Sequence, residues 1–236
     1  MRVTFLAHDG FLVELDRVCL LFDWWKETLP PLPDKPLLVL VSHRHEDHFN
    51  PAIFTLTERK PDIRFLLGSD FRLTPRNLEK WQLPPETAVK CRRCGKHDAF
   101  EPPPDVRLET FPSTDEGVAW MVTAEGRSIF HAGDLNWWHW AEEDAAWNRN
   151  MEVNFKRYTE PLRGRRADLA MLPLDPRMKK DGYLGPRYFL ELMDIRRFLP
   201  MHQWEDFDFT DDFLAAYPQF APMTAKIHHN LEAFTF

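Results

Sequence analysis

The sequence has 236 residues, of which 44% are hydrophobic and 14% aromatic, with a formal net charge of −7 at pH 7. This composition supports a sizeable core and excludes a disordered chain, and we expect a single domain over residues 1–236. The acidic charge offers no basic surface for phosphate backbones, so we expect no nucleic-acid partner. The N-terminal segment lacks the pattern of a signal peptide and no stretch has the length of a membrane span, which predicts a cytoplasmic protein without a membrane partner.

Short apolar runs separated by turn residues dominate the first half of the chain. In chain order, we expect strands at residues 3–7, 11–15 and 18–22, a strand at 37–41, a short helix at 51–59, a strand at 63–67 and a helix at 74–81. The first three runs predict a β-meander. The continuous apolar run at 37–41 is typical of a strand buried on both faces.

The second half repeats the order of strands followed by helices. In chain order, we expect strands at residues 106–111, 118–124 and 128–131, a largely helical segment at 138–158, a strand at 168–172, an amphipathic helix at 186–198, a helix at 211–217 capped by Thr210 and a terminal strand at 225–229. Two such halves suit two stacked sheets with helices outside.

The three cysteines do not form a disulfide framework. Cys91 and Cys94 have the spacing of a zinc knuckle, but a structural zinc needs a second pair of ligands and only His97 lies near in the sequence. We therefore expect an ordinary surface hairpin here rather than a metal site.

Four potential metal ligands directly follow the buried strand at 37–41: His43, His45, Asp47 and His48. Residues two apart in an extended or turning segment point the same way, so His43 and His45 can share one ion. Asp47 and His48, past the bend, can then reach a second ion. A single tetrahedral centre could not easily take all four ligands.

The order His-x-His-x-Asp-His resembles the defining motif of the metallo-β-lactamase superfamily. Further similarities follow in the expected order: the segment 130–134 resembles the strand end that carries a bridging aspartate, Asp134, and the segment 199–202 resembles the one that ends in the final metal histidine, His202. The segments 8–11 and 21–23 are similar to the opening hairpin of the branch that includes L-ascorbate-6-phosphate lactonase. The resemblance implies a four-layer αββα sandwich, an α/β fold, and a hydrolase that uses two divalent ions, with Asp47 also receiving a proton.

One position departs from the family pattern. Where most members supply a histidine between the first motif and the bridging aspartate, this chain has Asp115 and Glu116. We interpret Asp115 as the replacement ligand and keep Glu116 as the alternative, along with a simple turn. Three carboxylates would make the cluster less positive, so manganese or iron competes with zinc, the expected metal.

Other residues could support the metal site or bind substrate. Asp23 and Glu46 are candidates to accept hydrogen bonds from metal-bound imidazoles, and His8 and His131 are either similar supports or core histidines. We expect Trp138 and His139 to form a pocket wall and Arg177 to bind an anionic substrate group, with a solvated loop as the alternative for Arg177. Lys179, Lys180 and Arg187 are weaker candidates for the same role.

The function predicted from these features is hydrolysis of a small-molecule lactone, ester, amide or phosphoester. The alternatives are a nuclease of the same fold, a di-iron redox enzyme, and a metal-binding regulatory protein without turnover. The acidic charge argues against the nuclease. An intact His45 and the absence of a flavin domain in the sequence argue against the redox enzyme. The sequence does not indicate the substrate or the oligomeric state.

Overall fold

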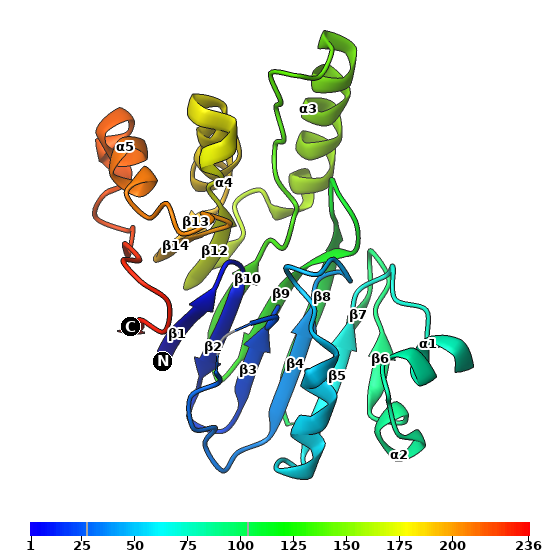
Figure 1. Cartoon of the computed structure of the whole chain (residues 1–236). Coiled ribbons are helices and arrows are strands. Elements are labelled where there is room, and N and C mark those ends of the chain that lie inside the picture. The colour runs from blue at the N-terminus through cyan, green and yellow to red at the C-terminus, as the bar shows by residue number, and fades with distance from the viewer. Residues whose placement is uncertain (27, 103) are drawn as a thin grey trace.

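The computed structural model describes residues 1–26, 28–102 and 104–236, and Figure 1 shows how their helices and strands are arranged. Two large β-sheets stack on each other, and helices cover their outer faces. This is the four-layer α/β sandwich that the sequence predicts. The described helices include none that is both long and apolar enough to span a membrane.

The first sheet is built mainly from the N-terminal half. Its strand order is β15-β1-β2-β3-β4-β5-β6. The bounds are β1 (Arg2–Ala7), β2 (Gly10–Glu14), β3 (Cys19–Phe22), β4 (Leu37–Val41), β5 (Ile63–Leu67), β6 (Cys91–Arg93) and β15 (Ala233–Thr235). The strands β1 to β3 form the predicted antiparallel meander, and β3 to β6 run parallel. Burial of every residue of β4 explains its uninterrupted apolar sequence.

The second sheet comes from the middle and C-terminal parts of the chain. Its strand order is β14-β12-β10-β9-β8-β7. The bounds are β7 (Ala99–Phe100), β8 (Val106–Pro112), β9 (Val118–Ala124), β10 (Arg127–His131), β12 (Leu169–Pro173) and β14 (Phe198–Met201), and a separate pair joins β11 (Arg166–Ala167) to β13 (Asp194–Ile195).

Helical segments cover the outer faces of both sheets. On the first sheet they are η1 (Pro51–Glu58), α1 (Pro75–Lys80) and α2 (Pro85–Ala88), and on the second α3 (Ala145–Thr159), η2 (Glu160–Leu162), η3 (Pro176–Tyr183), α4 (Leu184–Leu192), α5 (Phe209–Ala216) and η4 (Pro218–Phe220). Ile53 and Phe54 of η1 pack in a cluster with Phe65 of β5. Phe155 of α3 and Phe189 of α4 belong to the larger cluster, which also fills the space between the sheets.

Two predicted helices differ from the structure. The segment 138–158 is helical only from Ala145, because the Asn148 side chain binds the backbone N–H and carbonyl of Trp140 and holds the preceding aromatic residues in a loop. The predicted helix at 186–198 ends at Leu192, where Met193 becomes extended and β13 pairs with β11. Pairing with the neighbouring strands therefore overrides the helical periodicity of this segment.

Two C-terminal predictions are also wrong. Thr210 lies inside the first turn of α5, where its hydroxyl accepts a hydrogen bond from the Gln203 side chain instead of capping the helix. The terminal strand is Ala233–Thr235 rather than 225–229, and it adds an antiparallel edge to β1.

The segment with Cys91 and Cys94 is not the predicted hairpin. Cys91 begins β6 in the first sheet, and the chain then crosses to β7 in the second sheet. Burial raises the pKa of both thiols to about 12. Within the described residues, neither cysteine belongs to a cluster of potential metal ligands.

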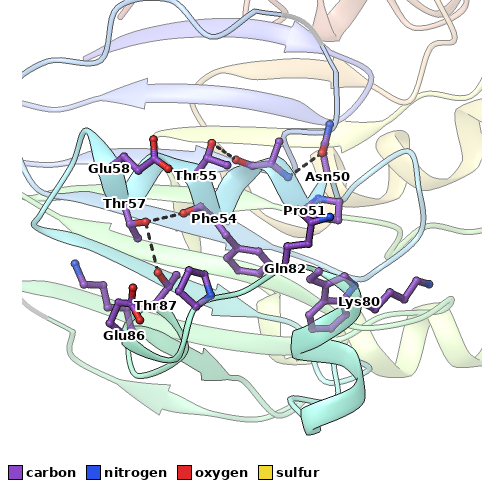
Figure 2. Close-up of a pocket in the computed structure, with 14 residues that line it drawn as sticks. Asn50, Pro51, Phe54, Thr55, Thr57, Glu58, Lys80, Gln82, Glu86 and Thr87 are labelled. Carbon is purple, nitrogen blue, oxygen red and sulfur yellow. Dashed lines mark hydrogen bonds between the residues drawn. The ribbon is translucent and has the colours of Figure 1, made fainter.

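A hollow of about 940 Å³ lies between η1, α1 and α2 (Figure 2). Its lining includes Asn50, Thr57, Glu86 and Lys90. None of the predicted metal ligands or substrate-binding residues lines it. This hollow is therefore separate from the predicted site.

Candidate metal centre

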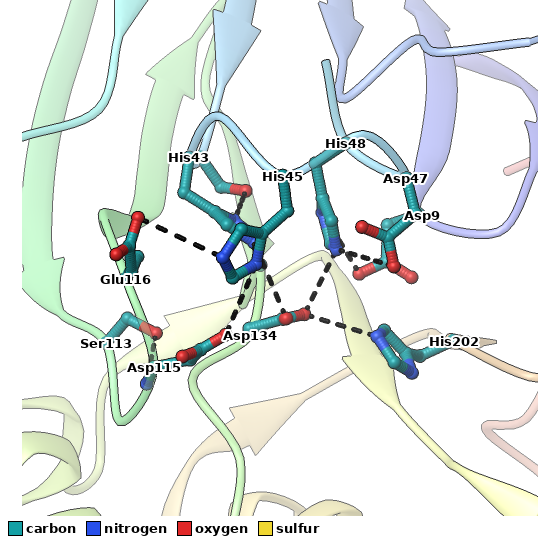
Figure 3. A network of polar contacts seen from close by, with 12 residues as sticks. Asp9, His43, His45, Asp47, His48, Ser113, Asp115, Glu116, Asp134 and His202 are labelled. Carbon is teal, nitrogen blue, oxygen red and sulfur yellow. Dashed lines mark hydrogen bonds and ion pairs between the residues drawn. The ribbon is translucent and has the colours of Figure 1, made fainter. Parts of the chain in front are cut away.

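Loops from both sheets bring the predicted ligands together (Figure 3). His43, His45, Asp47 and His48 follow β4 of the first sheet, whereas Asp134 follows β10 of the second. Asp115 lies in the β8–β9 loop and His202 follows β14. Carboxyl ends of strands from the two sheets thus meet at one edge of the sandwich, where open sheets place their sites.

Glycines allow these loops to approach closely. Gly117 has φ +71°, and a Cβ there would lie 1.9 Å from the Ser42 carbonyl oxygen and 2.6 Å from His43 Cβ. The Val118 N–H donates to the same Ser42 carbonyl over 3.1 Å. A larger residue at 117 would therefore separate the loop with Asp115 from the loop with His43.

The first group of potential ligands contains His43, His45, Asp115 and Asp134. One ligand atom from each lies within 4.8 Å of the others. His43 Nε2 is 3.6 Å from Asp134 Oδ2, and His45 Nδ1 is 3.5 Å from Asp115 Oδ2. This is the set predicted for the first ion, including the carboxylate in place of a histidine.

The alternative ligand, Glu116, lies farther out. Its Oε2 is 4.0 Å from His45 Nε2 and 3.7 Å from Arg44 Nε. Glu116 is not in the group of ligand atoms that contains Asp115. The geometry therefore favours Asp115 for this position.

His48 and His202 occur together in two further groups of potential ligands. One group adds His8 and Asp47, and the other adds Asp9 and Asp134. Asp134 Oδ1 is 3.3 Å from His48 Nε2 and 3.5 Å from His202 Nε2. Asp134 therefore belongs both to the first group and to one of these two groups, as expected of a bridging carboxylate.

Several buried polar atoms in this cluster have no hydrogen-bond partner. They include Asp134 Oδ1, His48 Nε2 and both carboxylate oxygens of Asp9. Leaving such groups unpaired away from water is costly, particularly for carboxylates. A cation bound among them would satisfy all four atoms, so the residues present fit a divalent metal.

Acidic side chains bind two of the imidazoles through the ring nitrogen that points away from the cluster. Asp23 accepts hydrogen bonds from His48 Nδ1 over 2.9 Å and from the Ser42 backbone N–H over 2.7 Å. Asp175 accepts from His202 Nδ1 over 3.0 Å and from Arg177 Nη2 over 2.6 Å. These contacts leave Nε2 of both histidines facing the cluster.

Burial and neighbouring charges shift the pKa values in the cluster. Burial raises the pKa of Asp134 to about 7, and the carboxylates of Asp115 and Asp47 add to this effect. Burial by itself would lower the pKa of His202, but Asp134, Asp9 and Asp175 outweigh it and raise the value to about 9. Burial lowers the pKa of His43 and His48 well below the usual value, which favours the neutral, ligating form of both rings.

His8 and His131 occupy different environments. His8 Nε2 is 3.4 Å from Asp47 Oδ2, so His8 reaches the cluster itself. His131 stacks on Phe22 at 4.9 Å, donates from Nε2 to the Asp9 carbonyl and accepts from the Gly133 N–H. His131 is therefore a core histidine that holds the adjacent loops. Glu46 is exposed and has no place in the cluster.

A pocket of about 540 Å³ opens over the ligands. Its lining combines metal-ligand candidates with large side chains: His45, Asp47, Thr114, Asp115, Asp134, Trp138, Trp140, Trp147, Met151, Arg177, His202 and Trp204. Trp138 stacks on Trp140 at 5.9 Å and donates from Nε1 to the Asp134 carbonyl. The Arg177 guanidinium lies 5.4 Å from the Trp140 ring and 4.7 Å from the Trp204 ring.

The structure does not bring every predicted substrate-binding residue to this pocket. His139 lines a separate hollow with Glu143 and Arg149, and its backbone N–H donates to Met178 Sδ over 3.4 Å. Lys179, Lys180 and Arg187 do not line the metal pocket, and Arg187 pairs with Glu191 along α4.

Several residues of the site were not predicted from the sequence. Asp175 precedes Arg177 without matching a metal motif, and Asp9 lies within the opening segment 8–11. Met151 reaches the pocket from α3, far in the sequence from any predicted ligand. Local signals existed for two of the others, since Trp204 lies two residues after His202 and Asp9 lies next to His8.

Comparisons with known proteins agree with this geometry. Residues 22–202 match the family model of the beta-lactamase superfamily domain. A UPF0173 metal-dependent hydrolase of Methanopyrus kandleri is 26% identical over 217 residues, which cover 86% of this chain and 84% of that protein. The chain belongs to the β-lactamase superfamily. Its family match and its relatives place it among the metal-dependent hydrolases.

Solved structures share the fold. Igni18, a metallo hydrolase from Ignicoccus hospitalis, superposes with a TM-score of 0.67 at 18% identity, covering 100% of this chain and 98% of that one. CmlA, a diiron β-hydroxylase from Streptomyces venezuelae, gives a TM-score of 0.64 at 10% identity and covers 100% of this chain and 54% of that one. One fold thus supports different chemistries, so the function has to be inferred from the residues of the site.

Proposed function

We propose that this protein hydrolyses a small-molecule lactone, ester, amide or phosphoester with two divalent metal ions. His43, His45, Asp115 and Asp134 would hold the first ion, and Asp47, His48, Asp134 and His202 the second. The observation that carries the proposal is the position of Asp134, whose two oxygens face His43 on one side and His48 and His202 on the other. A pair of bound ions supplies an activated water and polarises a carbonyl or phosphoryl oxygen.

Asp47 is suited to receive a proton beside the bound substrate. Its side chain lines the pocket and its Oδ2 lies 3.4 Å from His8 Nε2. Burial opposes ionisation, but the hydrogen bond and charge of His8 and the charge of His48 outweigh it and hold the pKa of Asp47 below its usual range. Asp47 is then a carboxylate at neutral pH, the form that can accept a hydrogen bond and, transiently, a proton from a water at the site.

Substrate binding is assigned to the aromatic wall and to Arg177. Trp138, Trp140 and Trp204 offer flat apolar surfaces directly beside the ligands, which suits a substrate with a ring or an extended apolar group. The Arg177 side chain forms a fork with Asp175, which offsets much of its charge. Arg177 would therefore donate a hydrogen bond to a substrate oxygen, and His139 is left out of this role by its position.

The donor set leaves zinc, manganese and iron as candidates for the metal. Imidazoles suit all three metals, whereas carboxylate oxygens favour manganese and iron. The formal charge of −7 supports a small molecule rather than a nucleic acid as the substrate. The cytoplasmic location and the single domain stay predictions from the sequence.

Elemental analysis of the protein purified without added metal tests the proposal, with His45→Ala and Asp115→Ala measured in parallel. We expect about two equivalents of zinc, manganese or iron in the wild type and a reduced content in both variants. Arg44→Ala, next to His45 but pointing to Asp70 and Glu116, serves as the control and should keep both equivalents.

Two other results would change the assignment. Loss of metal in His45→Ala alone would make Asp115 a turn residue. Absence of metal from the wild type, even after incubation with each ion, would overturn the hydrolase proposal and favour a binding protein. A screen of lactones and phosphoesters with the identified metal, using Asp47→Ala as the inactive control, would then define the substrate class.

A further inference from the structure

We infer that Asp9, in the turn between β1 and β2, is an additional carboxylate ligand of the second metal ion. Asp9, His48, Asp134 and His202 each offer one ligand atom, and these atoms lie within 4.8 Å of one another. The inference rests on the proposed function, because it concerns the same metal centre. It adds a ligand beyond the six motif residues and Asp115.

The Asp9 side chain is fully buried and unpaired. It is 0% exposed, and neither carboxylate oxygen has a hydrogen-bond partner. The hydrogen bond from His131 goes to the Asp9 backbone carbonyl, and the carboxylate oxygens have only longer contacts, 4.0 Å to His8 Nε2 and 3.7 Å to His48 Nδ1. A buried carboxylate without a hydrogen bond is costly unless it takes up a proton or a positive group compensates its charge, and a metal ion at this position would compensate it.

A role in orienting the histidines does not account for Asp9. Asp9 Oδ2 is 3.7 Å from His48 Nδ1, but that nitrogen already donates to Asp23 over 2.9 Å. His202 Nδ1 is likewise taken by Asp175. Since the outward nitrogen of each imidazole is already bonded to another carboxylate, orienting these two rings does not explain the buried Asp9 side chain.

The backbone holds Asp9 in this inward position. His8 has a positive φ of 55°, a strained backbone conformation that residues other than glycine rarely adopt. The His202 N–H donates to the His8 carbonyl, and His131 binds the Asp9 carbonyl, so residues of the second sheet fix both peptide groups of the turn. Figure 3 shows the Asp9 carboxylate beside His48, close to the Asp47 side chain.

Asp9 changes the charge of the metal centre. With Asp47, Asp115 and Asp134 it makes four carboxylates, whose charge balances two divalent ions before any hydroxide is bound. Three of these carboxylates surround the second ion, where zinc sites usually have more nitrogen or sulfur ligands. The second position should therefore prefer manganese or ferrous iron to zinc more strongly than the first position does.

The test compares binding of Mn²⁺ and Zn²⁺ to metal-free wild type and Asp9→Asn by calorimetry, together with the rise in melting temperature that each ion produces. Asn keeps the volume and removes the charge. We expect two Mn²⁺ ions in the wild type, and in Asp9→Asn one unchanged ion with the other bound at least tenfold more weakly. Mn²⁺ should be affected more than Zn²⁺.

Asp168→Asn is the matched control, because Asp168 is also a buried carboxylate but binds Ser128 and Arg166 away from the cluster. It should bind two ions like the wild type. Comparing each variant with and without metal removes effects on folding alone. If Asp9→Asn does not fold, a crystal structure of the wild type soaked with Mn²⁺ decides whether an Asp9 oxygen is bonded to the ion.

The outcomes separate this inference from the proposed function. Two unchanged Mn²⁺ ions in Asp9→Asn, or an Asp9 carboxylate not bonded to the ion in the crystal, would overturn the role of Asp9 while leaving the hydrolase proposal intact. A wild type that binds neither ion would overturn the proposed function and the inference with it.

Discussion

Asp175 links the metal centre to the substrate pocket through two neighbours. It accepts hydrogen bonds from His202 and from Arg177, and these two contacts, together with the charges of both side chains, lower its pKa to about 2 although burial opposes ionisation. An ionised Asp175 fixes the His202 ring with Nε2 toward the cluster. Carboxylates in this position commonly strengthen metal binding by their imidazole partner.

Replacing Asp175 with Asn should weaken metal binding without abolishing the fold. We expect about a 10- to 100-fold loss of affinity for one of the two ions, since outer hydrogen bonds to metal-bound histidines have effects of this size. Calorimetric titration of the metal-free protein with Zn²⁺ or Mn²⁺ measures the change. Arg177→Met keeps the Asp175–His202 contact and should change metal affinity much less, while raising KM for a substrate whose oxygen accepts the Arg177 hydrogen bond. Equal losses in both variants would contradict this division of roles.

At the scale of elements, loops rather than strands set the geometry of the site. Gly117 and Gly126 have nearly the same φ, +71° and +72°. A Cβ at Gly117 would overlap Ser42 and His43, whereas one at Gly126 meets no atom within 4 Å. Gly117 lies between two loops that carry ligands, and Gly126 lies in the turn between β9 and β10. Comparing alanine substitutions at these two glycines therefore separates the effect of backbone conformation from the effect of close approach between loops.

Gly126→Ala should lower the free energy of unfolding by about 1 kcal/mol, the penalty of a left-handed conformation. Gly117→Ala should lower it by about 3 kcal/mol, because about 2 kcal/mol of overpacking adds to that penalty. Urea denaturation of the metal-free proteins measures both values. Gly117→Ala should also bind metal more weakly, because it moves Asp115 away from His45. Similar decreases in the free energy of unfolding for the two variants would contradict this prediction and show that the two loops can move apart at little energetic cost.

The whole molecule depends on one large apolar cluster that both sheets share. Phe11 and Phe22 of the first sheet belong to the same cluster as Trp120 and Phe130 of the second. Each of these four side chains is fully buried. Neither sheet can therefore keep its apolar face covered without the other.

We accordingly expect the metal-free protein to unfold in a single transition, because the shared cluster couples the two sheets. Trp120→Ala should lower the free energy of unfolding by about 3–5 kcal/mol and keep one transition, because the cavity lies between the two sheets. Circular dichroism and tryptophan fluorescence followed in urea measure it. Two separate transitions, or probes that do not coincide, would mean that the sheets unfold independently.

The sequence by itself predicted most of the strands and the candidate metal ligands. The apolar run of β4 and the motif from His43 to His48 are local patterns, and both predict structure without information from distant residues. The family resemblance then identified Asp134 and His202, which the structure brings to the same cluster. The strands β5 and β9 are almost continuously buried apolar runs, and both begin and end at the predicted residues.

Only the tertiary structure decided the features that depend on partners far apart in the chain. The helix at Leu184–Leu192 ends where β13 finds β11, and the loop before α3 is shaped by Asn148, although local periodicity predicts a helix in both places. In the same way, Asp9 and Asp175 became part of the site because the fold buries them beside His48 and His202. The sequence shows that Asp9 and Asp175 are acidic, but it does not show that the fold removes their side chains from water. Their removal from water is what makes these carboxylates candidates for function.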